Sequence, residues 1–150
     1  MSRFTAYLDV RMLEGPDGRP LLKAGRCQWE VGSPLTYEVG AEGSGESITV
    51  PPGATTDLAS IPRAFWRLYP PDGPWLKAAV VHDWLYRNQG INCGQMVRAE
   101  GVNWRVTYSR AQADAILKEA MGVLGVGWLE REVIYRAVRL GGGSGWGAGD

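Results

Sequence analysis

The chain has 150 residues, 45% of them hydrophobic and 21% charged, and this size and composition predict one globular domain with a single core. Sixteen basic residues balance sixteen acidic ones, so the net charge gives no sign of a nucleic-acid partner or an anionic surface. No apolar run reaches the ~18 residues that cross a bilayer, and the N-terminus lacks a signal-peptide core. We therefore expect the chain to stay in the cytoplasm after synthesis, or to leave the cell inside a carrier such as a virion.

The chain has two cysteines, Cys27 and Cys93, which are too few for a disulfide framework. We expect two free thiols. With a single histidine elsewhere, this set does not favour a structural zinc site.

The first third of the chain predicts strands. Residues 3–13 alternate apolar and polar side chains, which is the period of a strand with one buried face. A turn follows at residues 15–18, and further strands are expected within 21–31, 35–39 and 48–50. Together they predict a small, mostly antiparallel N-terminal sheet.

The next segments predict helices. Ser60 can cap a short helix over residues 60–69, with Pro62 in its first turn. Residues 75–88 then predict a longer helix, which carries the one histidine of the chain, His82. Residues three and four positions from His82 are apolar, so we expect the imidazole to point inward.

Residues 90–107 lack a helical period, and segments 96–99 and 103–106 flank a turn. This pattern predicts a β-hairpin inserted between two helices. Insertions of this kind are often where partners are met, which makes Trp104 a candidate partner contact.

Two more helices complete the predicted domain. Ser109 and Gln112 form a capping box that begins a helix running to Leu124, and a last helix spans residues 128–140. Asp114 lies at the edge of the apolar stripe of the first of these helices, so it faces protein rather than open water. Trp146, in the glycine-rich tail, is either an anchor for a partner surface or an accident of sequence, and we favour the anchor.

The predicted fold is α+β. It has a small N-terminal antiparallel β-sheet followed by three main α-helices, with a β-hairpin inserted between the first two long helices. Residues 1–140 form a single domain, and residues 141–150 form a glycine-rich C-terminal tail. We expect the helices of His82 and Asp114 to pack antiparallel and to bring the two side chains together.

The candidate site residues have two interpretations each. A half-buried His82 beside Asp83 is either a base or metal ligand, or a core histidine satisfied by hydrogen bonds. Asp57 either bonds to nearby backbone amides or belongs to a site. Asp114 is either favoured by the helix dipole alone or has a role in the same site.

Three motifs resemble one family. They are VPPGATTDLASIPRAFW at residues 50–66, AAVVHDWLYR at 78–87, and SRAQADAILKEAMGVLGV at 109–126 with the downstream YRAVR at 135–139. Their order and spacing are similar to those of an uncharacterised family of small phage and prophage proteins, the domain of unknown function DUF1353. The resemblance implies a phage-encoded protein and supplies no mechanism.

The pattern from His82 to Tyr86 is also similar to the helix pair of phospholipase A2. That resemblance implies that His82 is a catalytic base, that Asp83 is a calcium ligand and that Asp114 orients the imidazole, with Tyr86 in the same pattern. Calcium is the one cofactor it implies. The chain departs from that family because only Asp72–Gly73 stands where a glycine-rich calcium loop would precede the helix. The disulfides of the secreted enzymes are missing as well.

Three functions are consistent with the sequence. We expect a virion-associated structural protein of a phage or prophage, made in the host bacterial cytoplasm, that docks on other virion proteins of the tail or tail tip. A homo-oligomer within the particle is compatible with this expectation. Here a buried polar network locks the helices onto the sheet; its members are His82, Asp83, Asp57, Arg63, Arg87 and Asp114.

The first alternative is a hydrolase of phospholipase A2 type, acting on lipid or cell-envelope material, and contact with a membrane is expected only in this case. The second is a non-virion phage assembly or host-modifying factor.

Overall fold

The computed structural model describes residues 4, 7–23, 26–41, 43–44, 46–56, 75–99, 102–141, 143 and 146. For residues 23, 26, 91–99 and 102–106 it describes the backbone alone. The short helix predicted over residues 60–69 lies outside the described residues.

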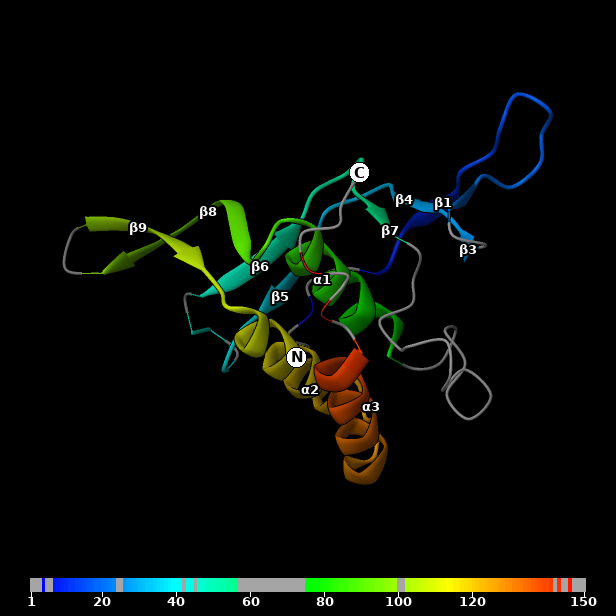
Figure 1. The fold of residues 1–150 in the computed structure, drawn as a ribbon. Helices are drawn as coiled ribbons and strands as arrows, with labels where there is room; N and C mark the ends of the chain where they lie inside the picture. The colour runs from blue at the N-terminus through cyan, green and yellow to red at the C-terminus, as the bar shows by residue number, and fades with distance from the viewer. Residues whose placement is uncertain are drawn as a thin grey trace.

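The fold is α+β, with short antiparallel strands followed by three helices (Figure 1). The N-terminal strands are β1 (Val10–Met12), β2 (Leu22–Lys23), β3 (Arg26–Cys27), β4 (Trp29–Val31), β5 (Leu35–Glu38), β6 (Ser47–Val50) and β7 (Thr55–Thr56). They pair as a three-stranded sheet in the order β1–β4–β7 and as two separate pairs, β2–β3 and β5–β6. Every pairing is antiparallel, as the sequence predicts.

The strands are shorter than their sequence pattern suggests. In the described part of the predicted strand over residues 3–13, β1 is the one strand, and Phe4 forms an isolated bridge to Tyr37. The predicted strand within residues 21–31 is divided into β2, β3 and β4, because the chain folds back on itself between β2 and β3. β7 was not predicted, since two residues have no period to detect.

The three helices are α1 (Leu76–Arg87), α2 (Arg110–Val123) and α3 (Trp128–Gly141). α2 begins at the predicted capping box, in which the Ser109 hydroxyl accepts from the Gln112 N–H at 3.1 Å and the Gln112 side chain accepts from the Ser109 N–H at 2.8 Å. It ends just before Gly125, whose φ of +84° favours glycine. α1 and α2 run antiparallel, because His82 contacts Asp114 while Tyr86, one turn later, contacts Arg110, one turn earlier.

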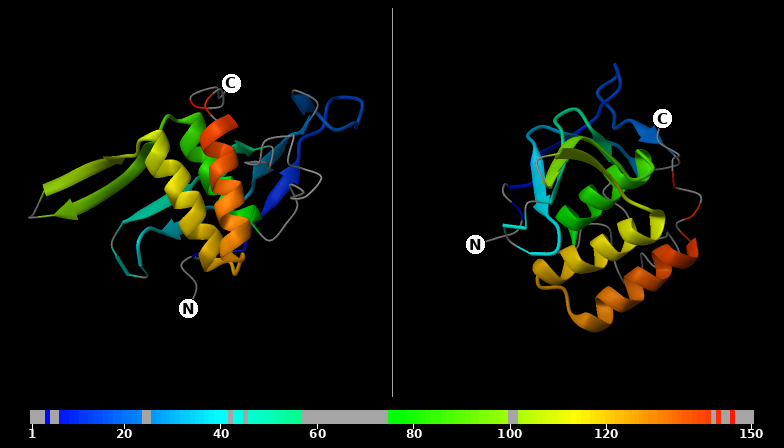
Figure 2. Two further views of the ribbon diagram at one scale, coloured as in Figure 1. Left: turned by 60° about the horizontal axis from the view of Figure 1, so that its bottom comes forward. Right: turned by 90° about the vertical axis from the view of Figure 1, so that its left-hand side faces the viewer.

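The core is built around α1, which packs against β6 on one side and α2 on the other, while α3 covers α2 (Figure 2). The fully buried side chains come from both layers: Tyr37, Ile48 and Val50 from the strands, and Val81, Leu85, Leu117, Met121 and Ile134 from the helices. Burying one aliphatic or aromatic side chain of this size contributes about 1.5–3 kcal/mol. The polar network described below is therefore embedded in an apolar interface.

The inserted hairpin consists of β8 (Ile91–Ala99) and β9 (Val102–Thr107). It extends away from the helices on one side of the molecule, opposite β1 and β4 (Figures 1 and 2). The two ends of the hairpin meet at its base, where the Tyr108 N–H donates to the Gly90 carbonyl at 2.8 Å. Gly90 has φ of +77°, and a Cβ there would lie 1.7 Å from the Tyr108 carbonyl oxygen, so the base requires glycine.

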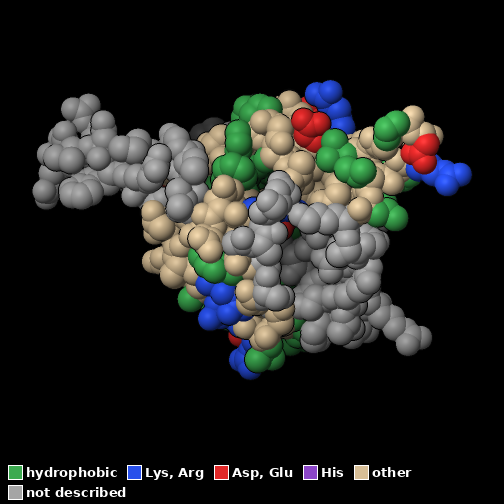
Figure 3. All heavy atoms as spheres, turned by 45° about the horizontal axis from the view of Figure 1, so that its top comes forward, with side chains coloured by type: hydrophobic (Ala, Val, Ile, Leu, Met, Phe, Trp, Pro, Cys, Tyr) green, Lys and Arg blue, Asp and Glu red, His purple; other side chains and the backbone are tan. Residues whose placement is uncertain are grey.

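Large hydrophobic side chains remain on the surface in several places. On the face shown in Figure 3 they lie in separate groups between polar and charged atoms. The exposed ones among the described residues are Tyr7, Met12, Leu21, Leu22, Trp128, Leu129 and Leu140. None of the described helices has the length and apolar character needed to span a membrane. Cys27 is a free thiol, as predicted, whereas the Cys93 side chain lies outside the described residues.

Candidate functional site: a buried histidine–aspartate network

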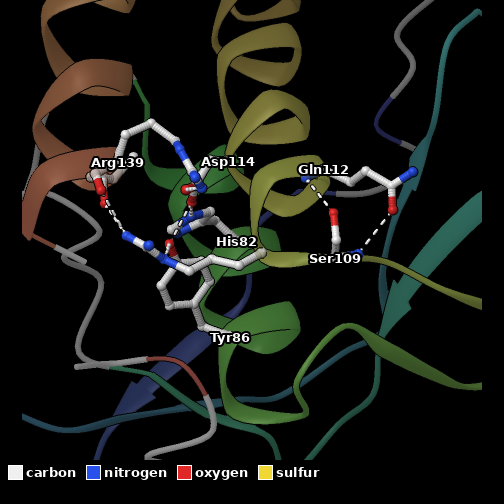
Figure 4. A network of polar contacts seen from close by, with 8 residues as sticks. His82, Tyr86, Ser109, Gln112, Asp114 and Arg139 are labelled. Carbon is white, nitrogen blue, oxygen red and sulfur yellow. Dashed lines mark hydrogen bonds and ion pairs between the residues drawn. The ribbon is translucent and has the colours of Figure 1, made fainter. Parts of the chain in front are cut away.

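His82 and Asp114 meet between α1 and α2, as the sequence predicts (Figure 4). The imidazole Nε2 lies 2.7 Å from Oδ1 of Asp114. Tyr86, one helical turn after His82, donates its hydroxyl to the same Oδ1 at 2.5 Å. Helical spacing places His82 and Tyr86 on one face of α1, and their rings lie 4.2 Å apart between centroids.

Two arginines extend this network to α3. Arg139 donates from Nη1 to Oδ2 of Asp114 at 2.7 Å, so the carboxylate receives donors from both neighbouring helices. Arg110 donates from Nε to the Tyr86 hydroxyl at 3.1 Å. Its Nη2 donates to the carbonyls of Val138 and Arg139 at 2.9 Å each, which satisfies acceptors in the last turn of α3.

The histidine and the aspartate at the centre of the network are buried. His82 is 3% exposed and Asp114 is 0% exposed. Burial by itself would raise the pKa of the Asp114 carboxyl, but the hydrogen bonds from His82, Tyr86 and Arg139 outweigh burial and hold that pKa below its usual range. Asp114 is therefore ionised, with the Arg139 guanidinium as its counter-charge.

The tyrosine in this network stays protonated. Burial and the hydrogen bond to Asp114 raise the pKa of Tyr86 to about 12, against the opposing effect of Arg110. Because Asp114 is ionised, Nε2 of His82 carries the hydrogen of this contact when the ring is neutral, and Nδ1 is then the basic nitrogen.

Asp83 belongs to a second, separate contact at β7. Its Oδ2 accepts from the Thr56 hydroxyl at 2.7 Å and lies 3.6 Å from Nε of Arg87. Arg87 also donates from Nη1 to the Thr55 hydroxyl at 3.3 Å. Asp83 and Arg87 thus fix α1 to β7, whereas His82 fixes α1 to α2.

Four of the six residues expected to form one network are described, and they form two separate contacts. Asp114 and His82 form one, and Asp83 with Arg87 forms the other. Asp57 and Arg63 lie outside the described residues.

Among the described residues, the contacts of Asp83 are those of an ion pair rather than of a calcium site. Calcium takes six to eight oxygen ligands, with carboxylates prominent among them, whereas the contacts of Asp83 given above are a hydroxyl donor and a guanidinium. Across the described ranges, no group of three or more His, Cys, Asp or Glu side chains could hold a metal ion.

Trp146 packs on the same network from the tail. Its ring meets that of Tyr86 edge-on, with centroids 5.2 Å apart, and it is partly buried against the core. The sequence predicted a partner anchor and gave no sign of this contact within the chain; the partner role remains a prediction. The side chain of Trp104, the other candidate partner contact, is not described.

The sequence pattern missed the two arginines that complete the network. Arg110 directly follows the capping serine, and Arg139 lies in the last turn of α3. A cation in the last turn of a helix is favoured by the helix dipole, but the position of Arg139 gives no sign of its carboxylate partner on α2. Arg110 acts on a helix other than its own, which no local pattern reveals.

The arrangement has two chemical uses. A neutral imidazole held by a carboxylate is the geometry of a general base. The same contacts between packed helices make a hydrogen-bonded polar network that specifies how the helices pack.

Comparisons with known proteins give one match. Neither the search of curated proteins nor the search of solved structures finds a match to this chain. The sequence profile of one family, described as "Protein of unknown function (DUF1353)", matches residues 29–138, which include α1, α2, nearly all of α3 and every residue of the network except Arg139. The chain belongs to the DUF1353 family of proteins of unknown function.

Proposed function

We propose that this protein is a virion-associated structural protein of a phage or prophage, placed in the tail or tail tip, where it docks on other virion proteins. The three motifs similar to phage and prophage proteins support the source. The geometry supports a docking role, because a locked helical body carries a β-hairpin that extends away from it (Figure 1).

The projecting hairpin is the observation that carries the proposal. A two-stranded hairpin alone is marginally stable in water, and β8 with nine residues is longer than any N-terminal strand. Contact with a partner would supply the surface that such a hairpin lacks. The described part of the chain gives it a firm base at Gly90 and Tyr108.

The buried network supports the same role. Asp114 accepts hydrogen bonds from His82, Tyr86 and Arg139, and Arg110 links Tyr86 to α3. A satisfied network of this kind favours one packing of three helices. A rigid body is what a particle component requires if the hairpin is to be presented in a fixed direction.

The test is the composition of purified particles. The wild-type protein should be present in a fixed number of copies per particle. A variant in which residues 92–106 are replaced by a short turn should fold, with unchanged helical circular dichroism, and be lost from particles. A wild-type protein that is abundant in infected cells and absent from particles would contradict the proposal and favour an assembly or host-modifying factor.

A second candidate function is hydrolysis of phospholipid or envelope esters, favoured by the His82–Asp114 contact at 2.7 Å. In this proposal Nδ1 of His82 takes a proton from water, and the water oxygen forms a bond to the ester carbonyl carbon. The bond to the alcohol oxygen then breaks, and His82 returns the proton to that oxygen. Asp114 holds the imidazole in the required tautomer by accepting from Nε2, and Tyr86 donates to the same carboxylate oxygen.

This candidate is tested by release of fatty acid from phosphatidylglycerol vesicles. His82→Gln and Asp114→Asn should each lower the release at least about 100-fold, as loss of a general base does, while Asp17→Asn at an exposed turn should not. A folded wild-type protein that releases no fatty acid, with or without calcium, would exclude this activity on that lipid. Melting temperatures measured with calcium test metal binding separately, because a bound ligand stabilises the folded state.

A further inference from the structure

A shallow pocket lies between the β5–β6 pair and the outer side of α2. Its volume is about 250 Å³. Val39, at the end of β5, and Ala115 and Ile116 of α2 form its apolar walls. Glu46 and Glu119 line it from opposite elements, which places two carboxylates at a mainly apolar hollow.

Both carboxylates are held in position by hydroxyl donors. The Tyr108 hydroxyl donates to Oε1 of Glu46 at 2.6 Å. The Tyr37 hydroxyl donates to Oε2 of Glu119 at 2.5 Å, and the Gly40 N–H lies 3.2 Å from its Oε1. Since the tyrosine rings are buried, the positions of the two acids are fixed by the core.

The charges of both Glu46 and Glu119 affect the Tyr108 hydroxyl. Burial raises the pKa of the Tyr108 hydroxyl, and the hydrogen bond to Glu46 and the charges of Glu46 and Glu119 raise it further. Tyr108 lines the pocket. Within the residues that the structure describes, no cation pairs with Glu46. The pocket therefore presents negative charge beside apolar walls, which is complementary to a cation with an aliphatic stem.

The size of the pocket indicates what kind of occupant it suits. Sites for whole small molecules usually have about 300–1,000 Å³, so about 250 Å³ suits a single side chain. Lysine and arginine place their methylene stems on apolar surface while the charged end reaches a polar group. We propose that this pocket seats a lysine or arginine side chain of a partner protein. The proposal rests on the docking function proposed above and names one point of contact.

The test is a titration of the full chain with Nα-acetyl-lysine methylamide, followed by amide chemical shifts in NMR. Saturable shifts are expected at Val39, Tyr108 and Ala115. The norleucine analogue, which has the stem without the charge, should give none. Glu46→Gln keeps an acceptor for the Tyr108 hydroxyl and should weaken binding about fivefold, the size expected for one partly exposed ion pair.

Glu130→Gln is the matched control, because it removes the same charge from an exposed position on α3 away from the pocket, and binding should not change. Equal binding of the norleucine analogue, equal affinity of Glu46→Gln, or shifts confined to another face would each overturn the proposal. These outcomes are independent of particle composition. If the protein is present in particles but does not bind the lysine probe, the pocket proposal fails and the docking proposal stands. If the protein binds the probe but is absent from particles, the docking proposal fails and the pocket still binds a cationic side chain.

Discussion

At the scale of single residues, Asp114 is the point on which the three helices converge. Its two oxygens accept from side chains of α1 and α3 while its backbone belongs to α2. A buried carboxylate without partners would be costly. With three donors, the same group becomes a specific link between helices.

Replacing Asp114 with Asn should lower the free energy of unfolding by about 2 kcal/mol, because the side chain keeps its size and loses the charge that pairs with Arg139. Urea unfolding followed by circular dichroism measures the loss. Glu132→Gln is the control: that carboxylate also pairs with two cations, Lys118 and Arg136, but at the surface, and its loss should be clearly smaller. Equal losses would mean that burial adds nothing at Asp114.

The meeting of His82 and Asp114 could be predicted because helical periodicity turns each toward protein, and because the resemblance to phospholipase A2 pairs the histidine with an aspartate on the next helix. The roles of Arg110 and Arg139 could not be predicted in the same way. A long arginine side chain has many rotamers, and its partner is chosen by the packing of another helix. The apolar pattern of α2 therefore identifies Asp114 as a buried carboxylate, but it does not identify Arg139 as its partner.

At the scale of elements, Gly90 controls how α1 leads into the hairpin. Gly90→Ala should cost at least about 3 kcal/mol, because the positive φ is strained for alanine and the new Cβ meets the Tyr108 carbonyl. Gly125→Ala is the matched control, since its φ of +84° is similar and nothing lies within 4 Å of the added Cβ. Thermal unfolding of both variants separates the effect of the contact with Tyr108 from that of the backbone strain. Equal losses of stability in the two variants would contradict a role for the contact.

The capping box gives a second prediction for an element. Ser109→Ala should lower stability by about 1 kcal/mol, because the Gln112 N–H loses its acceptor at the start of α2. Ser109→Asp supplies another cap and should recover most of this loss. Denaturant midpoints compare the three proteins, and no recovery with aspartate would show that the serine acts other than as a cap.

Helix positions were predicted well because their signals are local. Ser109 and Gly125 lie next to the ends that they determine. Strand limits depend on pairing with distant segments, so the division at β2 and β3 and the presence of β7 could not be predicted from residues 21–31 or 55–56 alone.

At the scale of the whole molecule, the lowered pKa of Asp114 predicts how stability depends on pH. The unfolded carboxyl titrates near its ordinary pKa of 3.8, and the folded one titrates lower. The stabilisation from the charged network is therefore fully present above that pKa and is lost as the pH falls through the folded pKa. Unfolding of wild type and Asp114→Asn from pH 7 to pH 2.5 should show a difference that is constant near neutrality and shrinks in acid. A difference independent of pH would contradict an ionised Asp114.

The closure of the chain at Gly90 and Tyr108 has a consequence for the evolution of this family. Because the chain leaves α1 and re-enters α2 at nearly one place, residues can be gained or lost in between without moving His82 away from Asp114. Insertions and deletions can therefore change the hairpin while α1 and α2 keep their contact. We expect related sequences to diverge most in length between the HDWLYR motif and the SRAQAD motif.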